Sequence, residues 1–248
     1  MTAPLPASVA ILGAGSYIGA AIARRFAQEG YAVHLGRRNG DELAPLLDEI
    51  RAAGGRATGR SLDARQPEDV TAFLEEADAA APLDLCLFNV GGNVRFPLTA
   101  TTDRVFRKVW EMGCFAGFVA AREAARIMVP RGRGSIFLTG ATASLRGGSG
   151  FSAFAAAKFG LRAVAQSAAR ELGPQGIHVA HLVIDAGVDT RFVRDRIAAA
   201  EGPQALETLA PDRLMNPASI AETYLQLHRQ PRDAWTFETE LRPYAEKW

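Results

Sequence analysis

The sequence lacks several features that would restrict its class. It contains two cysteines, Cys86 and Cys114, and both lie in apolar segments, which favours buried thiols in a reducing compartment over a disulfide. No apolar run approaches the roughly 18 residues of a membrane span. The first basic residue is Arg24, so the amino terminus lacks the charged start of a signal peptide. We therefore expect a cytoplasmic protein with no membrane partner.

Charge of one sign is not in excess either. The chain has 28 Lys and Arg residues against 27 Asp and Glu residues, which argues against a polyanionic partner such as nucleic acid. No paired carboxylates or metal-ligand clusters stand out, which disfavours lyase, isomerase or metal chemistry. The 248 residues are 48% hydrophobic and 22% charged, as in a globular domain with a substantial core.

One early stretch, VAILGAGSYIGAAIARRF from Val9 to Phe26, organises the chain. Its first four residues form an apolar run typical of a strand buried on both faces. Gly13, Gly15 and Gly19 follow, and apolar residues then recur at helical spacing. A strand, a glycine turn and a helix aim unpaired amide hydrogens at one point, where a phosphate binds favourably.

Strand and helix patterns alternate along the rest of the chain. A second strand is expected at residues 31–35, and a third ends near residues 61–63. Further strands are expected at 83–88, 134–139, 177–184 and 235–241. Helices are expected at about 41–53, from Pro67, at 101–128 and 152–172, and from Asn216-Pro217. No linker or repeat interrupts the pattern. We predict one α/β domain over residues 1–248, a doubly wound parallel sheet with helices on both faces.

The glycine turn resembles the T-G-x-x-x-G-x-G loop of the short-chain dehydrogenase/reductase family, with Leu12 at the threonine and Tyr17 at the middle glycine. The resemblance implies a nicotinamide dinucleotide over this turn. Tyr17 either crowds the turn or covers the pyrophosphate. The turn residues that the resemblance assigns to the cofactor are Gly13, Gly15, Ser16, Tyr17, Ile18 and Gly19.

The end of the second expected strand favours NADP over NAD. An acidic residue there would bind the ribose hydroxyls of NAD, but the chain has Arg37 and Arg38, whose fork-shaped donors suit a 2′-phosphate. A solvated basic turn is the alternative.

The family pattern implies further cofactor contacts on the next strand ends. Leu62 and Asp63 would meet the adenine, although Asp63 is also placed to cap a helix. Asn89-Val-Gly-Gly resembles the family's Asn-Asn-Ala-Gly, with Asn89 and Gly91 matching, and a plain turn is the alternative. Thr190 matches a residue near the nicotinamide carboxamide.

The catalytic pattern of the family is only partly present. Its Tyr-x-x-x-Lys pair matches Phe154-Ala-Ala-Ala-Lys158, so the lysine that binds the nicotinamide ribose is kept and the phenol is not. Its serine aligns with Ala141, next to Thr142. Its asparagine aligns with Gly113, or with Cys114 if Gly117 sets the register.

Other side chains are candidates for the missing roles. Asp185, after the sixth strand, is either an acid or base near the cofactor or a cap of the next segment. Arg95 and Arg146 flank the family's substrate cleft, where they either bind a carboxylate or an oxyanion or are merely solvated. His178 and His181 are expected to pack along the sixth strand.

Two functions follow from this pattern. The first is an NADP-dependent oxidoreductase with a non-standard active site. It would move hydride to or from a small carbonyl, imine or activated alkene, with Lys158, Asp185 and Thr142 as catalytic candidates and the proton from Asp185, Thr142, substrate or water. The second is a catalytically silent NADP-binding module. The alanine-rich helix 152–172 has small residues on all sides and is expected to be buried by close neighbours. The resemblance implies a homo-oligomer, a dimer or tetramer, through this helix and the preceding long one.

Overall fold

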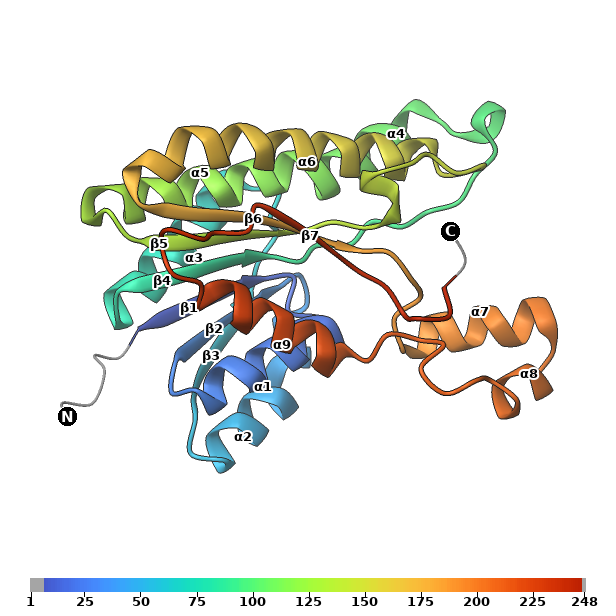
Figure 1. Ribbon diagram of the computed structural model, residues 1–248, viewed down its shortest axis with the longest axis horizontal. Coiled ribbons are helices and arrows are strands. Elements are labelled where there is room, and N and C mark those ends of the chain that lie inside the picture. The colour runs from blue at the N-terminus through green and yellow to red at the C-terminus, as the bar shows by residue number, and fades with distance from the viewer. Residues whose placement is uncertain (1–6, 247–248) are drawn as a thin grey trace.

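The computed structural model describes residues 7–246 and contains one parallel sheet (Figure 1). Its strand order is β3-β2-β1-β4-β5-β6-β7, and every neighbouring pair is parallel. The strands are β1 Ser8–Leu12, β2 Ala32–Arg37, β3 Arg56–Ser61, β4 Leu83–Phe88, β5 Gly134–Thr139, β6 Ile177–Ile184 and β7 Glu238–Leu241. The predicted doubly wound sheet is confirmed. Its last strand is shorter than the predicted 235–241.

Helices cover both faces of this sheet (Figure 1). They are α1 Ile18–Gln28, α2 Ala44–Ala52, α3 Pro67–Ala80, α4 Asp103–Trp110, α5 Ala116–Met128, α6 Ser152–Leu172, α7 Arg191–Glu201, α8 Gln204–Glu207 and α9 Pro217–His228. α1, α2 and α9 pack on one face, and α3, α5 and α6 on the other. α7 and α8 project beyond the sheet. Among residues 7–246, no helix combines the length and the apolar character needed to cross a bilayer.

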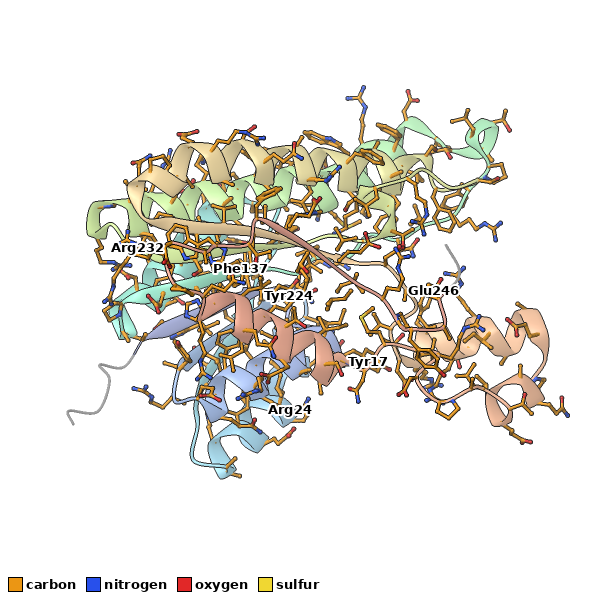
Figure 2. The ribbon with its side chains drawn as sticks, viewed as in Figure 1. Tyr17, Arg24, Phe137, Tyr224, Arg232 and Glu246 are labelled. Carbon is orange, nitrogen blue, oxygen red and sulfur yellow. The ribbon has the colours of Figure 1, made fainter. Side chains whose placement is uncertain are left out.

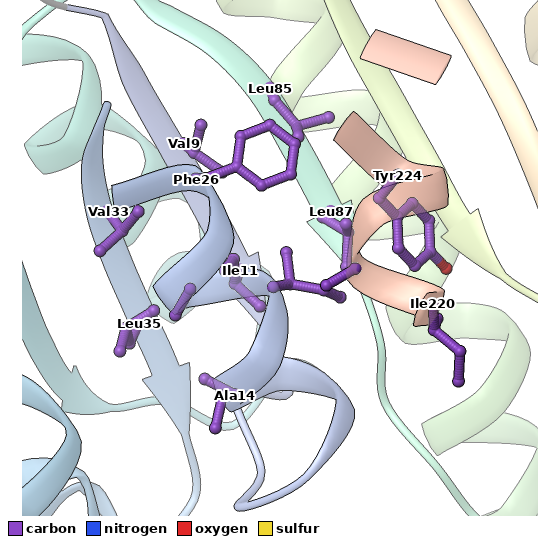
Figure 3. Packing of buried hydrophobic residues seen from close by; sticks show 14 of the residues in the cluster. Val9, Ile11, Ala14, Phe26, Val33, Leu35, Leu85, Leu87, Ile220 and Tyr224 are labelled. Atoms are coloured by element: carbon purple, nitrogen blue, oxygen red, sulfur yellow. The ribbon is translucent and has the colours of Figure 1, made fainter. Parts of the chain in front are cut away.

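The side chains of β1 show how the sheet separates two cores. Val9 and Ile11 enter the core under α1 and α9, shown in Figure 3, and Ala10 and Leu12 enter the core under α3, α5 and α6. All four are fully buried, as the unbroken apolar run predicts for a strand with helices on both sides.

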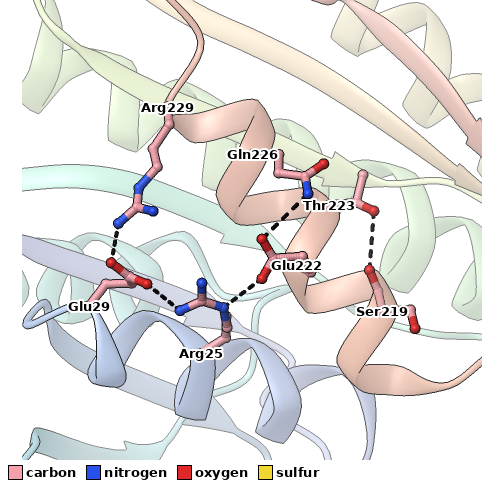
Figure 4. A network of polar contacts seen from close by, with 7 residues as sticks. All are labelled: Arg25, Glu29, Ser219, Glu222, Thr223, Gln226 and Arg229. Carbon is pink, nitrogen blue, oxygen red and sulfur yellow. Dashed lines mark hydrogen bonds and ion pairs between the residues drawn. The ribbon is translucent and has the colours of Figure 1, made fainter.

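Ion pairs also join α1 to α9, two helices far apart in the sequence (Figure 4). Arg25 of α1 donates from Nε to Glu222 of α9 at 2.7 Å and also pairs with Glu29. Glu29 in turn pairs with Arg229, directly after α9. These contacts fix the helix that begins at the glycine turn against the far end of the chain.

The long helix predicted over residues 101–128 is interrupted by a π-helical turn at Glu111–Phe115. Thr102 caps its first segment by accepting a hydrogen bond from the Val105 amide at 3.3 Å. A π turn adds one residue to a helical turn and rotates the side chains that follow it. It therefore decides which residues of α4 and α5 reach the sheet.

Within the single chain, the helix over residues 152–172 is buried on one side and exposed on the other. Leu161 and Ala165 of α6 are fully buried against the sheet, but Phe159 is 42% exposed. Large apolar side chains of α4 and α5 are exposed beside it, namely Phe106, Trp110 and Phe118. The small residues allow close packing on the sheet side and leave an apolar outer surface.

Candidate functional site

A cleft of about 1620 Å³ opens at the carboxyl ends of strands β1 to β6. Such ends, at the point where the strand order reverses between β1 and β4, are where open α/β sheets bind ligands. The volume exceeds the 300–1,000 Å³ typical of one drug-sized molecule. The predicted site residues that line it are Gly13, Gly15, Ser16, Tyr17, Ile18, Gly19, Arg37, Arg38, Leu62, Asp63, Asn89, Gly91, Thr142, Lys158 and Thr190.

The turn after β1 is too tight for side chains at two of its glycines. Gly13 has φ +89°, and a Cβ atom there would lie 2.6 Å from the Asn89 carbonyl oxygen. Asn89 donates from Nδ2 to the Gly13 carbonyl at 3.2 Å, which ties β4 to the turn. A Cβ at Gly19 would lie 2.7 Å from Ala14 Cα. Glycine is therefore required at both positions.

The same turn presents unpaired donors to the cleft. The amides of residues 16–19 form no hydrogen bond with any residue between 7 and 246, whereas the Ala20 amide bonds the Gly15 carbonyl at 2.9 Å. A Cβ at Gly15 would meet no atom within 4 Å, so the backbone there is open to a ligand. Free amides at a helix N-terminus fit the pyrophosphate of a dinucleotide.

Tyr17 does not fill the glycine turn. Its side chain is 40% exposed and lies toward α7 (Figure 2). Its hydroxyl accepts a hydrogen bond from the Arg191 backbone amide at 3.0 Å. The neighbouring Thr190 caps α7 by accepting a bond from the Val193 amide at 3.1 Å. Tyr17 therefore connects the turn to the start of α7.

The two arginines at the end of β2 differ in their partners. Arg37 is paired with Glu42. Arg38 is exposed and forms no hydrogen bond or ion pair with any residue between 7 and 246. Its guanidinium remains available for an anionic ligand.

Asp63 follows β3 and pairs with Arg65 rather than capping a helix. Arg65 donates from Nη2 to its Oδ2 at 2.5 Å and from Nε to its Oδ1 at 2.9 Å, and this pairing lowers the pKa of the Asp63 carboxyl. The expectation of a helix cap is wrong, because Gln66 occupies the N-cap of α3.

Lys158 is the buried cation of the cleft wall, with 3% exposure. Its ammonium donates to the Thr139 carbonyl at 2.8 Å and the Val90 carbonyl at 3.4 Å. Burial lowers the pKa of Lys158 from 10.5 to about 8, because desolvation disfavours the charged form. Two of its three protons are thus directed at backbone carbonyls, one at the end of β5 and one in the loop after β4.

Phe154 lies one helical turn before Lys158 and also lines the cleft. It packs with Val109, Ala143 and Ala157 in a small apolar cluster. Thr142 lines the same region, and its hydroxyl has no hydrogen-bond partner between residues 7 and 246. Phe154, whose ring carries no hydroxyl, and Thr142, whose hydroxyl is free, therefore line the same cleft.

Several sequence candidates lie outside the cleft lining. Gly113 instead faces Ala157, whose Cβ would lie 3.0 Å from a Cβ at 113. Cys114 is buried against Gly160, and burial raises the pKa of its thiol. Met112 and Ala116 line the cleft in their place. The sequence did not predict that these two residues line the cleft. A regular helical period was assumed there, and the π turn shifts which residues face the cleft.

Asp185 is also absent from the cleft lining among the described residues. It is 2% exposed, and its carboxylate pairs with Arg146 at 3.2 Å and Arg242 at 2.6 Å. The sequence left two roles open for Asp185, an acid or base near the cofactor and a cap of the next segment. Its carboxylate instead lies outside the cleft lining and is bonded to two arginines. Arg146 and Arg95 do line the cleft.

The two histidines of β6 pack beneath the site. His178 stacks on Trp235 with ring centroids 5.0 Å apart. His181 bonds Glu238 at 2.9 Å, and burial lowers its pKa to about 4. Between residues 7 and 246, no three His, Cys, Asp or Glu residues gather as a metal site.

Comparisons with known proteins agree with this geometry. Residues 7–200 match the short chain dehydrogenase family. A 1-deoxy-11-beta-hydroxypentalenate dehydrogenase of Streptomyces exfoliatus is 30% identical over 241 residues, which cover 91% of this chain and 87% of the relative.

Two solved structures are also similar to this chain along nearly its whole length. A short-chain dehydrogenase from Rhodopseudomonas palustris is 59% identical with a TM-score of 0.82, covering 96% of this chain and 99% of the other. A single-substitution variant of the actinorhodin polyketide ketoreductase, solved with NADPH, is 25% identical with a TM-score of 0.84, covering 95% of each chain.

Proposed function

The chain belongs to the short chain dehydrogenase family, and from this premise we propose that it is an NADP-dependent oxidoreductase with a non-standard active site. The observation that supports this most is the combination of free amides at residues 16–19 with the unpaired guanidinium of Arg38 in one cleft. The amides would hold the pyrophosphate, and Arg38 the 2′-phosphate that distinguishes NADP from NAD. The solved relative that carries NADPH agrees with this choice.

The remaining cofactor contacts follow from the lining of the cleft. Asn89 and Gly91 would approach the ribose, Leu62 and Asp63 the adenine, and Thr190 the carboxamide. Lys158 would bind the nicotinamide ribose. When bound, the cofactor supplies or accepts the hydride for a small carbonyl, imine or activated alkene.

The protein's own contribution to catalysis would come from Lys158 and Thr142. Phe154 and Ala141 stand where the family pattern has tyrosine and serine, and neither side chain donates a proton. The free hydroxyl of Thr142 would polarise the substrate oxygen. Lys158, whose pKa of about 8 lies near physiological pH, would release the proton that follows the hydride. Asp185, buried between two arginines, is better suited to hold Arg146 in place.

A catalytically silent NADP-binding module is the second candidate. The loss of the phenol favours it, because a positioned acid contributes roughly 10²–10⁴-fold to the rate. A binding module needs the glycine turn, Arg38 and Lys158 but no proton donor. Turnover, rather than cofactor affinity, separates the two candidates.

Titration with NADPH and NADH tests the proposal directly. We expect micromolar NADPH binding with much weaker NADH binding, and equal affinities would contradict the role of Arg38. A panel of ketones, aldehydes, imines and activated alkenes should then oxidise bound NADPH, and no turnover with any of them would favour the silent module. The Phe154→Tyr/Ala141→Ser variant should gain ketone reductase activity if the rest of the scaffold is intact.

We also propose that the chain forms a homo-oligomer through α4, α5 and α6. Phe106, Trp110, Phe118 and Phe159 are each 40–42% exposed on these helices. Large exposed aromatic side chains on neighbouring helices are characteristic of an interface. A second copy of the chain would cover it in a dimer or tetramer.

A further inference from the structure

Arg146 is an exposed guanidinium held in place by a buried carboxylate. Its Nη1 and Nη2 atoms lie 3.2 Å from Oδ2 and Oδ1 of Asp185, whose side chain is 2% exposed. Arg242, 11% exposed, donates to the same carboxylate at 2.6 Å and also pairs with Glu240. The side chain of Arg146 nevertheless remains 47% exposed and lines the cleft. A flexible side chain is thus fixed where a ligand would meet it.

Arg95, on the loop after β4, lines the same cleft and contacts the loop that follows Arg146. Its guanidinium carbon lies 5.7 Å from the centre of the Phe151 ring. Gly150 has φ +83°, and a Cβ there would lie 3.0 Å from Arg95 Cγ, so a glycine makes room for this side chain. The Phe96 amide bonds the Gly150 carbonyl at 2.9 Å and ties the two loops together. No carboxylate between residues 7 and 246 pairs with Arg95.

Arg146 shares its carboxylate partner, whereas Arg95 has none. Asp185 pairs with both Arg146 and Arg242, and Arg242 also pairs with Glu240; Arg95 pairs with no carboxylate between residues 7 and 246. Among the described residues, four carboxylates line the cleft. Two of them, Glu42 and Asp63, are paired with Arg37 and Arg65. The other two are Glu201 at the end of α7 and Glu246.

We propose that Arg146 and Arg95 bind a carboxylate carried by the substrate, and that Asp185 and Arg242 are positioning residues for Arg146. Guanidinium groups match the planar geometry of a carboxylate and bind it with charge-assisted hydrogen bonds. The site shares the cleft with Phe154, Thr142 and Lys158. A substrate anchored at the arginines would therefore extend toward the reacting end of the cofactor. This inference rests on the proposed function and adds the class of substrate, a small carbonyl compound that carries a carboxylate.

A matched pair of probes tests the charge preference. We would measure binding of 4-formylbenzoate and of 4-formylbenzamide by calorimetry to the full chain, with and without NADP⁺. The benzoate should bind at least tenfold more tightly, since a hydrogen bond to a charged group contributes about 1.5–3 kcal/mol. Its affinity should fall as ionic strength rises. Equal affinities for the two probes would overturn the proposal.

Variants assign the effect to residues. Arg95→Gln and Arg146→Gln should each weaken benzoate binding about tenfold to a hundredfold and leave benzamide and NADPH binding unchanged. Arg104→Gln, an exposed arginine of α4 outside the cleft lining, is the control and should change neither. Arg95→Gln guards against a folding defect, because Arg95 forms no ion pair within the described residues. No change in either variant would refute the site.

The positioning role of Asp185 has its own readout. Asp185→Asn should raise KM for 4-formylbenzoate with little change in kcat, and leave KM for 4-formylbenzamide unchanged, whereas general destabilisation would affect both probes. If NADPH itself does not bind, the proposed function fails, yet the probe measurements on the cofactor-free protein still decide this inference. If NADPH binds and the probes do not differ, this inference alone fails.

Discussion

The hydroxyl of Tyr17, on the glycine turn, accepts a hydrogen bond from the backbone amide of Arg191 at 3.0 Å, across 174 positions of sequence. It joins the residue that precedes the first helix to α7, which also contributes residues to the lining of the cleft. Arg191 is the first residue of α7, where amides lack partners inside the helix. The tyrosine therefore satisfies a donor that would otherwise face solvent.

We predict that Tyr17→Phe loosens the start of α7. A neutral hydrogen bond contributes about 1 kcal/mol, so hydrogen exchange of the Arg191 amide should accelerate roughly fivefold. Tyr244→Phe is the matched control, because Tyr244 is 83% exposed and has no hydrogen bond within the described residues. Unchanged exchange at residue 191 in Tyr17→Phe would show that the contact is not maintained in solution.

Arg38 and Arg37 should differ in their effect on cofactor choice. Since Glu42 already occupies Arg37, Arg38→Ala should weaken NADPH binding by roughly tenfold to a hundredfold, the loss expected for one charge-assisted contact. NADH binding should change little. Glu42→Gln should strengthen NADPH binding by freeing Arg37. Fluorescence titration of both nucleotides measures this, and a parallel loss of NADPH and NADH affinity would rule out 2′-phosphate recognition.

The sequence predicted the sheet well because its strands are short apolar runs bounded by glycine or polar residues. The 83–88, 134–139 and 177–184 strands have the predicted bounds. The same pattern predicted which strand ends contribute to the cleft, since parallel strands end at one edge. It failed where long-range contacts decide. The pairing of Asp185 with Arg242 depends on β7 lying beside β6, and no local signal records that.

Acid should destabilise the fold through His181. Burial lowers its pKa from 6.5 to about 4, so between these values the unfolded chain binds a proton that the folded chain does not. Stability therefore falls as pH drops from 6.5 to 4, by an amount on the order of 3 kcal/mol. Urea unfolding of the wild type and of His181→Asn across this range measures the effect. The free energy of unfolding of the variant should fall less steeply as pH drops. Identical slopes for the two proteins would mean that His34 and His178, which are also buried and have lowered pKa values, carry the pH dependence.

The exposed aromatic side chains of α4 and α6 should control assembly. We expect Trp110→Glu/Phe159→Glu to convert an oligomer into monomers in sedimentation velocity, because charges at the centre of an apolar interface are left without partners. Phe192→Glu, on α7 and 59% exposed, is the control and should leave the assembly intact. A wild-type chain that sediments as a monomer at micromolar concentration would contradict the proposed interface.

Reduction should slow as pH rises through about 8, if Lys158 is the proton donor. Its pKa is lowered from 10.5 to that value by burial, so above pH 8 the ammonium that acts as the acid is progressively lost and the rate should fall about tenfold per pH unit. Lys158→Arg, which stays protonated throughout, should be slower at pH 7 but should lose this dependence, whereas Lys108→Arg on α4 should retain the wild-type profile. Rates are measured at saturating NADPH and substrate, so that weaker binding does not mimic the effect. A wild-type rate that is constant from pH 7 to 10 would assign the proton to solvent or substrate and leave Lys158 with the ribose alone.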